Sequence, residues 1–431
     1  MNAKKNSKRR KSADRIAMVS THGYMAADPP IGEPDTGGQV IYVLELSRKF
    51  ALMGYKVDIW TRQFEDQPPQ EEVAKNVRIL RVPCGGNEFI PKEYLYESLP
   101  EWTENALRKI KKDKLRYQFI NSHYWDAGVA SQNLANALNV IHVHTPHSLG
   151  IVKKQRMISD GRADPEEFEK EHNFSQRIHH EKLVYRESDL VVATAPPILD
   201  SVQQEYDIPT EKVKMIPPGY DDNLFFPVGE SSRQVLRHQY GYEGKKVIAA
   251  AARLARTKGF DLLIEAFRVV LEREPDAYLR LATGAETEIE QNDPVWKHLN
   301  EMIADYDLQD HVLLTKAVSF EGMPDYYRSA DVFALPCRYE AFGMTGIEAM
   351  ACGTPSVLTV HSGLVRTVSY GAEALYGDPF DKEDFGITLL KALRYKSLRQ
   401  RLSLQGARKM RSLFTWTGIA QQLLRAVEGR E

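Results

Sequence analysis

The chain has 431 residues, more than a single hydrophobic core usually holds, so two domains of similar size are expected. Its 57 Lys and Arg residues balance 59 Asp and Glu residues, and a net charge of −2 gives no overall field that favours nucleic acid or a membrane surface. Three scattered cysteines and the lack of a long apolar run or secretion signal predict a cytoplasmic protein without a membrane span.

Residues 1–14 include a run of lysines and arginines, which predicts a basic disordered tail. After this tail, short β-branched runs alternate with longer helical patterns, as is typical of parallel sheets with crossover helices. Strands are expected at residues 16–20, 57–61, 77–82, 119–122, 140–144 and 190–194. Between the first two, apolar residues from Val40 to Phe50 recur at steps of three and four, which predicts one buried helix face.

Two glycines stand directly before that helix, in the order Gly37, Gly38 and Gln39. Such glycines let backbone amides approach a phosphate or a reacting sugar, although an ordinary loop turn explains the pair about as well. The segment is no dinucleotide fingerprint, because Gly-x-Gly-x-x-Gly is absent and no Walker lysine follows.

Histidines gather around the strand expected at residues 140–144. His142 and His144 alternate along it, but no third ligand follows at a suitable spacing, so packing is a better interpretation than a metal site. His147 follows the end of the strand, where its side chain is expected to point toward a ligand.

A second set of strands is expected at residues 247–250, 279–282, 312–314, 332–335 and 356–358. The domain boundary therefore falls near residues 217 to 235. The predicted fold class is α/β, with two doubly wound Rossmann-like domains that face one another across a cleft. Because ligands of such sheets bind at the carboxyl ends of the strands, we expect both domains to contribute to one site.

The most informative segment runs from Arg338 to Pro355 and contains Glu340 and Glu348 with seven residues between them. A loop containing Gly343 leads into a helix whose free N–H groups can receive a diphosphate without a metal. Glu348, one turn inside this helix, can accept hydrogen bonds from both hydroxyls of a ribose, while Glu340 can face the sugar. The segment therefore predicts a nucleotide-sugar site.

This segment resembles the Glu-x7-Glu motif of retaining glycosyltransferases with the two-domain GT-B fold, in the sucrose-phosphate synthase-like group. Residues 19–24, 35–40, 121–128, 215–223 and 412–422 are similar to a bacterial branch of that group. The resemblance implies an acceptor-binding domain at residues 15–225 and a donor-binding domain at residues 226–412. It also implies a terminal helix at residues 413–431 that crosses back to the first domain.

The resemblance implies roles for individual residues. The donor-binding positions are Gly38, Arg253, Lys258, Glu340, Phe342, Gly343, Met344, Thr345 and Glu348. The acceptor-binding positions are Gly37, Gly38, Gln39, Lys92, Lys153 and Arg177. The catalytic positions are His147, Glu340, Arg253 and Lys258. No metal, cofactor or nucleic-acid partner is implied.

The implied reaction transfers mannose from GDP-mannose to fructose 6-phosphate with retention, giving mannosylfructose phosphate. Transfer from UDP-glucose, as in sucrose-phosphate synthases, is the alternative within the class. Four residues depart from the usual pattern: Ala341 replaces proline, and Ala252, Ala285 and Ser362 replace glycines. A new Cβ at a position that needs a positive φ costs about 1 kcal/mol, so a weakened paralogue that senses sugar nucleotides is a further alternative.

Overall fold

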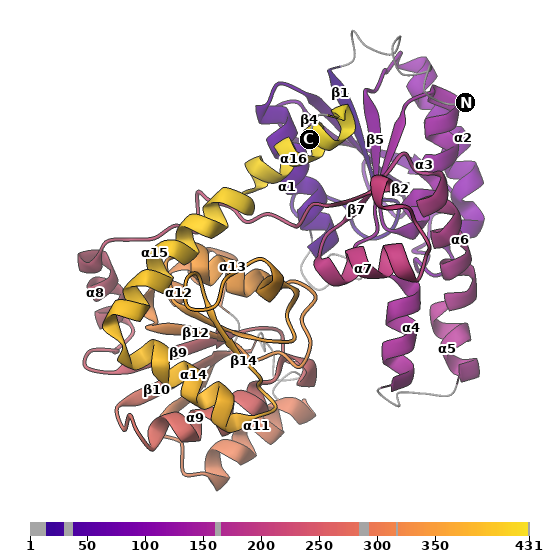
Figure 1. Cartoon of the computed structure of the whole chain (residues 1–431). Coiled ribbons are helices and arrows are strands. Elements are labelled where there is room, and N and C mark those ends of the chain that lie inside the picture. The colour runs from indigo at the N-terminus through magenta and orange to yellow at the C-terminus, as the bar shows by residue number, and fades with distance from the viewer. Residues whose placement is uncertain (1–13, 30–37, 160–164, 284–292, 316–317, 430–431) are drawn as a thin grey trace. The chain divides into compact units, whose positions relative to one another are not determined.

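The computed structural model describes residues 14–29, 38–159, 165–283, 293–315 and 318–429 (Figure 1). The predicted basic tail up to residue 13 lies outside these ranges. The chain divides into two compact units. The first unit comprises residues 1–217 and 419–431, and the second comprises residues 218–418.

Within its described residues, the first unit contains an eight-stranded sheet in the order β3-β4-β2-β1-β5-β6-β7-β8. The strands are β1 (Arg15–Val19), β2 (Lys56–Gln63), β3 (Gln70–Ala74), β4 (Val77–Pro83), β5 (Phe119–His123), β6 (Ile141–Thr145), β7 (Leu190–Ala193) and β8 (Val213–Met215). Neighbouring strands run parallel except β3 and β4. The sequence predicted the parallel core but missed both edge strands, β3 and β8. Strand β3 is polar and lacks an apolar run, and β8 has only three residues.

The helices of the first unit are α1 (Gly38–Leu52), α2 (Leu99–Lys112), α3 (Trp125–Leu138), α4 (Gly150–Ser159), α5 (Pro165–His172), α6 (Phe174–Glu187) and α7 (Pro196–Gln204), with 3-10 turns η1 (Leu95–Ser98) and η2 (Thr210–Lys212). Helix α1 lies on one side of the sheet, and α2, α3 and α6 lie on the other (Figure 1). As predicted, α1 buries the apolar stripe from Val40 to Phe50.

The second unit contains, in the part that the structure describes, a six-stranded parallel sheet in the order β11-β10-β9-β12-β13-β14. The strands are β9 (Lys246–Ala251), β10 (Ala277–Ala282), β11 (Val312–Thr315), β12 (Val332–Leu335), β13 (Ser356–Thr359) and β14 (Leu375–Gly377). The sequence predicted the first five of these strands. Two α/β units with mostly parallel sheets confirm the predicted fold class.

The helices of the second unit are α8 (Glu230–Gln239), α9 (Phe260–Leu271), α11 (Pro294–Asp305), α12 (Met323–Ser329), α13 (Met344–Ala351), α14 (Lys382–Arg394) and α15 (Lys396–Leu413), with 3-10 turns η3 (Arg256–Lys258), η4 (Phe320–Gly322) and η5 (Gly363–Arg366). The last helix, α16 (Trp416–Glu428), begins in the second unit, and from Ile419 its residues belong to the first. No helix among the described residues combines the length and apolar character needed to cross a membrane.

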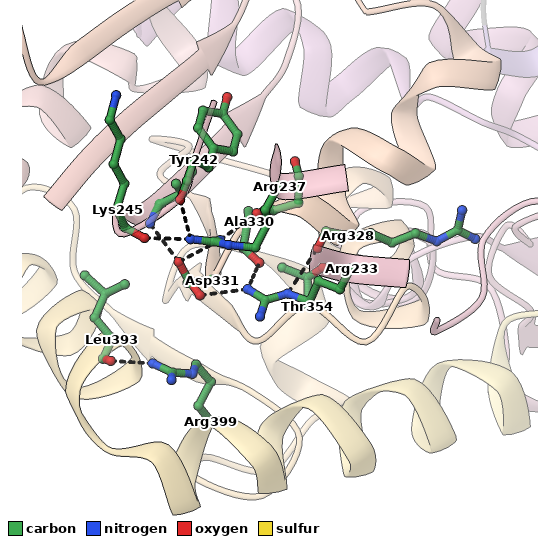
Figure 2. Close-up of polar contacts among 12 residues, drawn as sticks. Arg233, Arg237, Tyr242, Lys245, Arg328, Ala330, Asp331, Thr354, Leu393 and Arg399 are labelled. Atoms are coloured by element: carbon green, nitrogen blue, oxygen red, sulfur yellow. Dashed lines mark hydrogen bonds and ion pairs between the residues drawn. The ribbon is translucent and has the colours of Figure 1, made fainter. Parts of the chain in front are cut away.

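A buried ion-pair cluster anchors α8 at the amino end of the second sheet (Figure 2). Asp331, directly before β12, accepts hydrogen bonds from Arg233 at 2.7 Å, from Arg237 at 3.0 Å and from the Val247 amide at 2.9 Å. Arg237 also donates to three backbone carbonyls. The cluster therefore joins α8 to the start of β9 and to the residue before β12, away from the carboxyl ends of the strands, where ligands of such sheets bind.

Candidate active site

The residues predicted to bind the donor in the second unit lie where its sheet order reverses, between β9 and β12. Ligands of open α/β sheets bind outside the carboxyl ends of the strands at this point. Arg253, which follows β9, is exposed, and Lys258 ends η3. Lys258 Nζ lies 2.7 Å from Glu340 Oε2, so the structure brings together two predicted residues that are 82 positions apart.

Backbone contacts fix Glu340 at the entrance of this loop. Its amide donates to the His361 carbonyl at 3.2 Å, and its carbonyl accepts from the Gly363 amide at 3.0 Å. The loop thus pairs with the segment after β13 before it enters α13. Phe342 is buried, with its ring in edge-to-face contact with Phe414.

Gly343 begins the turn into α13 with φ at 103°, in the left-handed region that favours glycine. A Cβ added there would lie 2.9 Å from Leu335 Cδ2, so packing as well as conformation requires glycine. Met344 and Thr345 follow in the first helical turn, where backbone N–H groups lack partners within the helix. The turn therefore gives the local geometry that an anion requires at a helix N-terminus.

Glu348, one turn into α13, is held by Tyr327, whose hydroxyl donates to Oε2 at 2.8 Å. Burial raises the pKa of Glu348 to about 7, and the hydrogen bond from Tyr327 opposes part of that rise. A carboxylate with this pKa changes charge near neutral pH, which is a common property of functional groups.

The sequence analysis gave no role to Arg338, which joins the loop before Glu340 to the segment that follows β9. Arg338 donates to both carboxylate oxygens of Asp261, at 2.7 and 2.6 Å, and to the Arg256 carbonyl at 2.7 Å. Burial opposes ionisation of Asp261, but the hydrogen bonds and charge of Arg338 outweigh it and lower the pKa of this carboxyl group. Arg338 is the first residue of the segment that contains the Glu-x7-Glu motif, but its partner is 77 positions away in the sequence.

In the first unit, His147 follows β6 with φ at 59°, an uncommon value for a residue with a Cβ. Its ring meets the edge of Tyr42 at 5.0 Å, and its Nε2 lies 2.9 Å from Nδ1 of His123. Burial lowers the pKa of His147 to about 3, and the nearby His22 lowers it further. His147 is therefore neutral at physiological pH.

The Gly-Gly-Gln segment is described from Gly38 onward, and Gly37 lies outside the described residues. Gly38 is exposed, and a Cβ added to it would meet no atom within 4 Å. Gln39 donates to Ser20 Oγ at 3.0 Å and to the His123 carbonyl at 3.3 Å. Packing of the described chain therefore does not require glycine at position 38.

The three predicted acceptor cations influence one another in the first unit. Burial lowers the pKa of Lys153, and the charges of Arg177 and Lys92 lower it further. Lys92 also forms an ion pair with Glu93 at 3.7 Å. Three cations close enough to interact form the electrostatic setting in which a phosphate dianion is stabilised.

Arg177 is only 3% exposed and pairs with Glu181 at 2.8 Å. It also donates to the carbonyl and the hydroxyl of Ser148. Glu181 accepts hydrogen bonds from the Gly150 amide at the start of α4, the helix that carries Lys153. Glu181, which the sequence analysis gave no role, therefore fixes two predicted cation positions, while phosphate binding by Arg177 stays a prediction.

The histidines that the sequence analysis assigned to packing do pack. The Ser122 hydroxyl lies 2.8 Å from His142 Nε2 and 2.8 Å from His144 Nδ1. Among the described residues, no group of three His, Cys, Asp or Glu side chains is arranged to hold a metal ion.

Comparison with known proteins identifies the family. Models described as "Glycosyl transferases group 1", "Glycosyltransferase Family 4" and "Sucrose synthase first GT-B domain" match residues 232–409, 36–224 and 8–56. Mannosylfructose-phosphate synthase from Agrobacterium fabrum is 57% identical over 96% of this chain and 91% of its own length. The chain belongs to the GT-B glycosyltransferases. It is a hexosyltransferase related to mannosylfructose-phosphate synthase, as the resemblance in the sequence indicated.

Two further relatives place this GT-B glycosyltransferase in its wider group. D-inositol 3-phosphate glycosyltransferase from Corynebacterium urealyticum is 31% identical over 95% of the chain and 94% of the relative. The solved structure of sucrose-phosphate synthase from Thermosynechococcus elongatus matches with a TM-score of 0.75 and 28% identity, and covers 96% of this chain and 98% of that one.

The departures from the usual GT-B pattern cause less strain than the sequence suggested. Ala252, Ala341 and Ser362 all lie outside the positive φ range, and Ser362 has φ at −98°. The Ser362 hydroxyl donates to the Phe342 carbonyl at 2.9 Å and accepts from the Leu364 amide at 3.2 Å. The expected strain of a Cβ at a positive φ is therefore wrong for Ala252 and Ser362, while Ala285 lies outside the described residues.

Proposed function

We propose that the protein is a retaining mannosyltransferase that transfers mannose from GDP-mannose to fructose 6-phosphate and forms mannosylfructose phosphate. The observation that carries the proposal is the donor-site geometry of Lys258, Glu340 and Glu348 in a chain 57% identical to a mannosylfructose-phosphate synthase. The buried free thiols of Cys84, Cys337 and Cys352 support a reducing, cytoplasmic setting.

On the donor side, Arg253 and Lys258 balance the diphosphate as the sugar departs. The negative charge on this leaving group grows in the transition state, so fixed cations there lower the barrier more than they tighten substrate binding. The backbone amides at the start of α13, from Met344, add the positive end of the helix dipole. Ionised Glu348 accepts hydrogen bonds from the ribose hydroxyls, and Glu340, already held by Lys258, faces the sugar.

On the acceptor side, Lys92, Lys153 and Arg177 hold the phosphate of fructose 6-phosphate. Gln39 and the backbone at Gly37 and Gly38 position the acceptor sugar. The phosphate group explains why three cations gather in one region of the first unit, since an unphosphorylated sugar offers them no anion.

The mechanism proceeds with retention and without an enzyme nucleophile. The diphosphate departs and the acceptor hydroxyl attacks on the same face of the sugar, while the departing phosphate oxygen takes the hydroxyl proton. Neutral His147 orients the reacting sugar through a hydrogen bond near its C6 hydroxyl. Glu340 and Glu348 serve the donor and do not act as a glycosidase pair.

A second candidate is transfer from UDP-glucose to the same acceptor. The match to a solved sucrose-phosphate synthase at 28% identity favours it. A third candidate is a weakened paralogue that only binds sugar nucleotide. The structure gives it less support than the sequence did, because Ala252 and Ser362 avoid the strained backbone region.

The test is a matrix of donors and acceptors with product identification. GDP-mannose, GDP-glucose, UDP-glucose and ADP-glucose are each combined with fructose 6-phosphate, fructose and glucose 6-phosphate, without added metal and again with Mg²⁺. We expect GDP and a phosphorylated disaccharide only from GDP-mannose with fructose 6-phosphate. Product from UDP-glucose alone supports the second candidate, and nucleotide binding without product from any pair supports the sensor.

A further inference from the structure

Two histidines of the first unit are in direct contact, and only one of them has a role in the proposed function. His123 is the last residue of β5, and His147 follows β6, the neighbouring parallel strand. Nδ1 of His123 lies 2.9 Å from Nε2 of His147, and the ring centroids are 5.2 Å apart. The contact joins the carboxyl ends of two neighbouring strands.

Both rings are neutral, so the contact requires a single proton between them. Burial lowers the pKa of His147 to about 3, and burial with the nearby His147 and His144 lowers the pKa of His123 well below its usual value. A neutral imidazole has one N–H donor and one acceptor nitrogen. One ring must therefore donate to the other, and the direction sets the tautomer of both.

The surroundings of His123 indicate which ring donates. Its Nε2 is buried and has no hydrogen-bond partner among the described residues. A proton on this nitrogen would leave a buried N–H unsatisfied, which native structures seldom tolerate. A proton on Nδ1 instead points at Nε2 of His147 and leaves only a lone pair unpaired.

The same argument fixes the second ring. If Nε2 of His147 accepts, its proton must reside on Nδ1. Within the described part of the chain, Nδ1 of His147 bonds no protein group, and the residue is only partly buried. That N–H is the group through which His147 can donate to a ligand.

We propose that His123 is a positioning residue, whose Nδ1–H donates to Nε2 of His147 and holds His147 in the tautomer that offers Nδ1–H to the donor sugar. The identity of the ligand as the donor sugar rests on the proposed function, whereas the assignment of the His147 tautomer does not. His123 also contacts Gln39, a predicted acceptor-binding residue, because the His123 carbonyl accepts a hydrogen bond from the Gln39 side chain at 3.3 Å. One residue thus supports both a donor-orienting histidine and a residue proposed to hold the acceptor.

The first experiment measures the tautomer and needs no activity. In ¹⁵N-histidine-labelled protein, two-bond ¹⁵N–¹H correlations distinguish Nδ1–H from Nε2–H, and His147→Gln assigns the signals of His147. We expect Nδ1–H on His147 in the wild type and in His123→Asn, whose amide nitrogen can replace the donor. We expect Nε2–H or a doubly protonated ring in His123→Asp, which only accepts, and a mixture of tautomers in His123→Leu.

The second experiment measures turnover of the same variants with the best substrate pair. We expect kcat to fall about tenfold or more in His123→Asp, with the acceptor KM within about twofold, and the Asn variant to retain most activity. His142→Leu is the matched control, because it removes a buried histidine of β6 that lies outside this contact. Nε2–H on wild-type His147, or an Asp variant as active as the Asn variant, would overturn the proposal. Failure of every substrate pair alongside the expected tautomer would count against the proposed function alone.

Discussion

The two ends of the sheet in the second unit both carry cations and carboxylates, but their degree of pairing differs. At the amino end, Asp331 has three donors, and Arg237 is satisfied by Asp331 and three carbonyls (Figure 2). At the carboxyl end, among the described residues, Lys258 pairs with one carboxylate, that of Glu340, and Arg253 is exposed. Glu348 is partly buried and accepts a hydrogen bond from Tyr327.

This difference separates structural charges from functional ones. A buried charge with every hydrogen bond made has nothing left to offer a ligand, and removing one member leaves the others unpaired. A charged group at the carboxyl end of the strands that has not made all its hydrogen bonds can still bind an anion or a hydroxyl group. Mutations at the amino end should therefore change stability, and mutations at the carboxyl end should change catalysis and binding.

The largest expected effect tests the amino end. Asp331→Ala leaves Arg237 buried without its carboxylate and should lower the free energy of unfolding by about 3 kcal/mol, the lower end for a broken buried ion pair, because three carbonyls still accept from Arg237. Urea unfolding followed by circular dichroism measures this loss. Arg399→Ala, which removes only a hydrogen bond to the Leu393 carbonyl, should cost far less (Figure 2). An Asp331→Ala protein of normal stability with lost turnover would contradict the comparison.

The next effect tests the carboxyl end. Lys258→Met removes the cation that we propose stabilises the leaving diphosphate, and it should lower kcat/KM by about 100-fold or more, with little change in stability. Steady-state kinetics with GDP-mannose and fructose 6-phosphate measures it.

Lys246→Met is the matched control for Lys258. Lys246 also pairs with a single glutamate, Glu274, but lies in the first position of β9, at the opposite end of the same sheet. Its loss should leave kcat/KM within about twofold, because it lies away from the predicted donor residues and Glu274 keeps its ion pair with Arg394. Equal losses in the two variants would show that position in the sheet does not separate the two classes of charge.

The third expected effect is a pH dependence of donor binding that arises from Glu348. Its carboxylate is ionised only above its pKa of about 7, and ribose hydroxyls donate best to the ionised form. GDP-mannose binding should therefore weaken as pH falls from 8 to 6, by up to about tenfold for each pH unit below that pKa. Isothermal titration calorimetry measures this, and GDP-mannose is the ligand chosen because its phosphates do not titrate in this range.

The free energy of unfolding of the ligand-free protein should instead rise as pH falls through this range. Because folding raises the pKa of Glu348, the folded chain binds this proton more tightly than the unfolded chain does. The resulting stabilisation is fully present below the unfolded pKa of about 4 and is lost as pH rises through about 7. Glu348→Gln should remove both pH dependences and weaken binding at pH 8. Unchanged pH dependence of GDP-mannose binding in that variant would exclude Glu348 as its source.

The sequence predicted the local features of the candidate site and of the fold, because these depend on residues that are close together in the chain. The Glu340 to Glu348 spacing, the turn at Gly343 and the helix from Met344 follow from local chemistry, and the strands follow from apolar runs. The partners could not be predicted, because Lys258 and Glu340 are 82 residues apart and Tyr327 reaches Glu348 from another helix.

The departures from the family pattern show the same limit. The sequence suggested that Ser362 strains its loop, whereas its hydroxyl contacts the Phe342 carbonyl and the Leu364 amide. A residue type that is unusual for a family says nothing about which hydrogen bonds the surrounding fold offers it. Only the φ angle and those two contacts could reveal that the replacement is compensated.

The smallest expected effect concerns Ser362. It tests whether the serine at this position lowers turnover. Ser362→Gly restores the usual residue but removes both hydrogen bonds, so the free energy of unfolding should fall by about 1 kcal/mol and turnover should not rise. Ser362→Ala separates the hydroxyl from the backbone, since it loses the same contacts without adding the flexibility of glycine. Because Ser362 lies at φ −98°, glycine offers no relief of strain there. A several-fold rise in kcat for the glycine variant would instead mean that the serine crowds the donor, and would favour the weakened sensor over the active transferase.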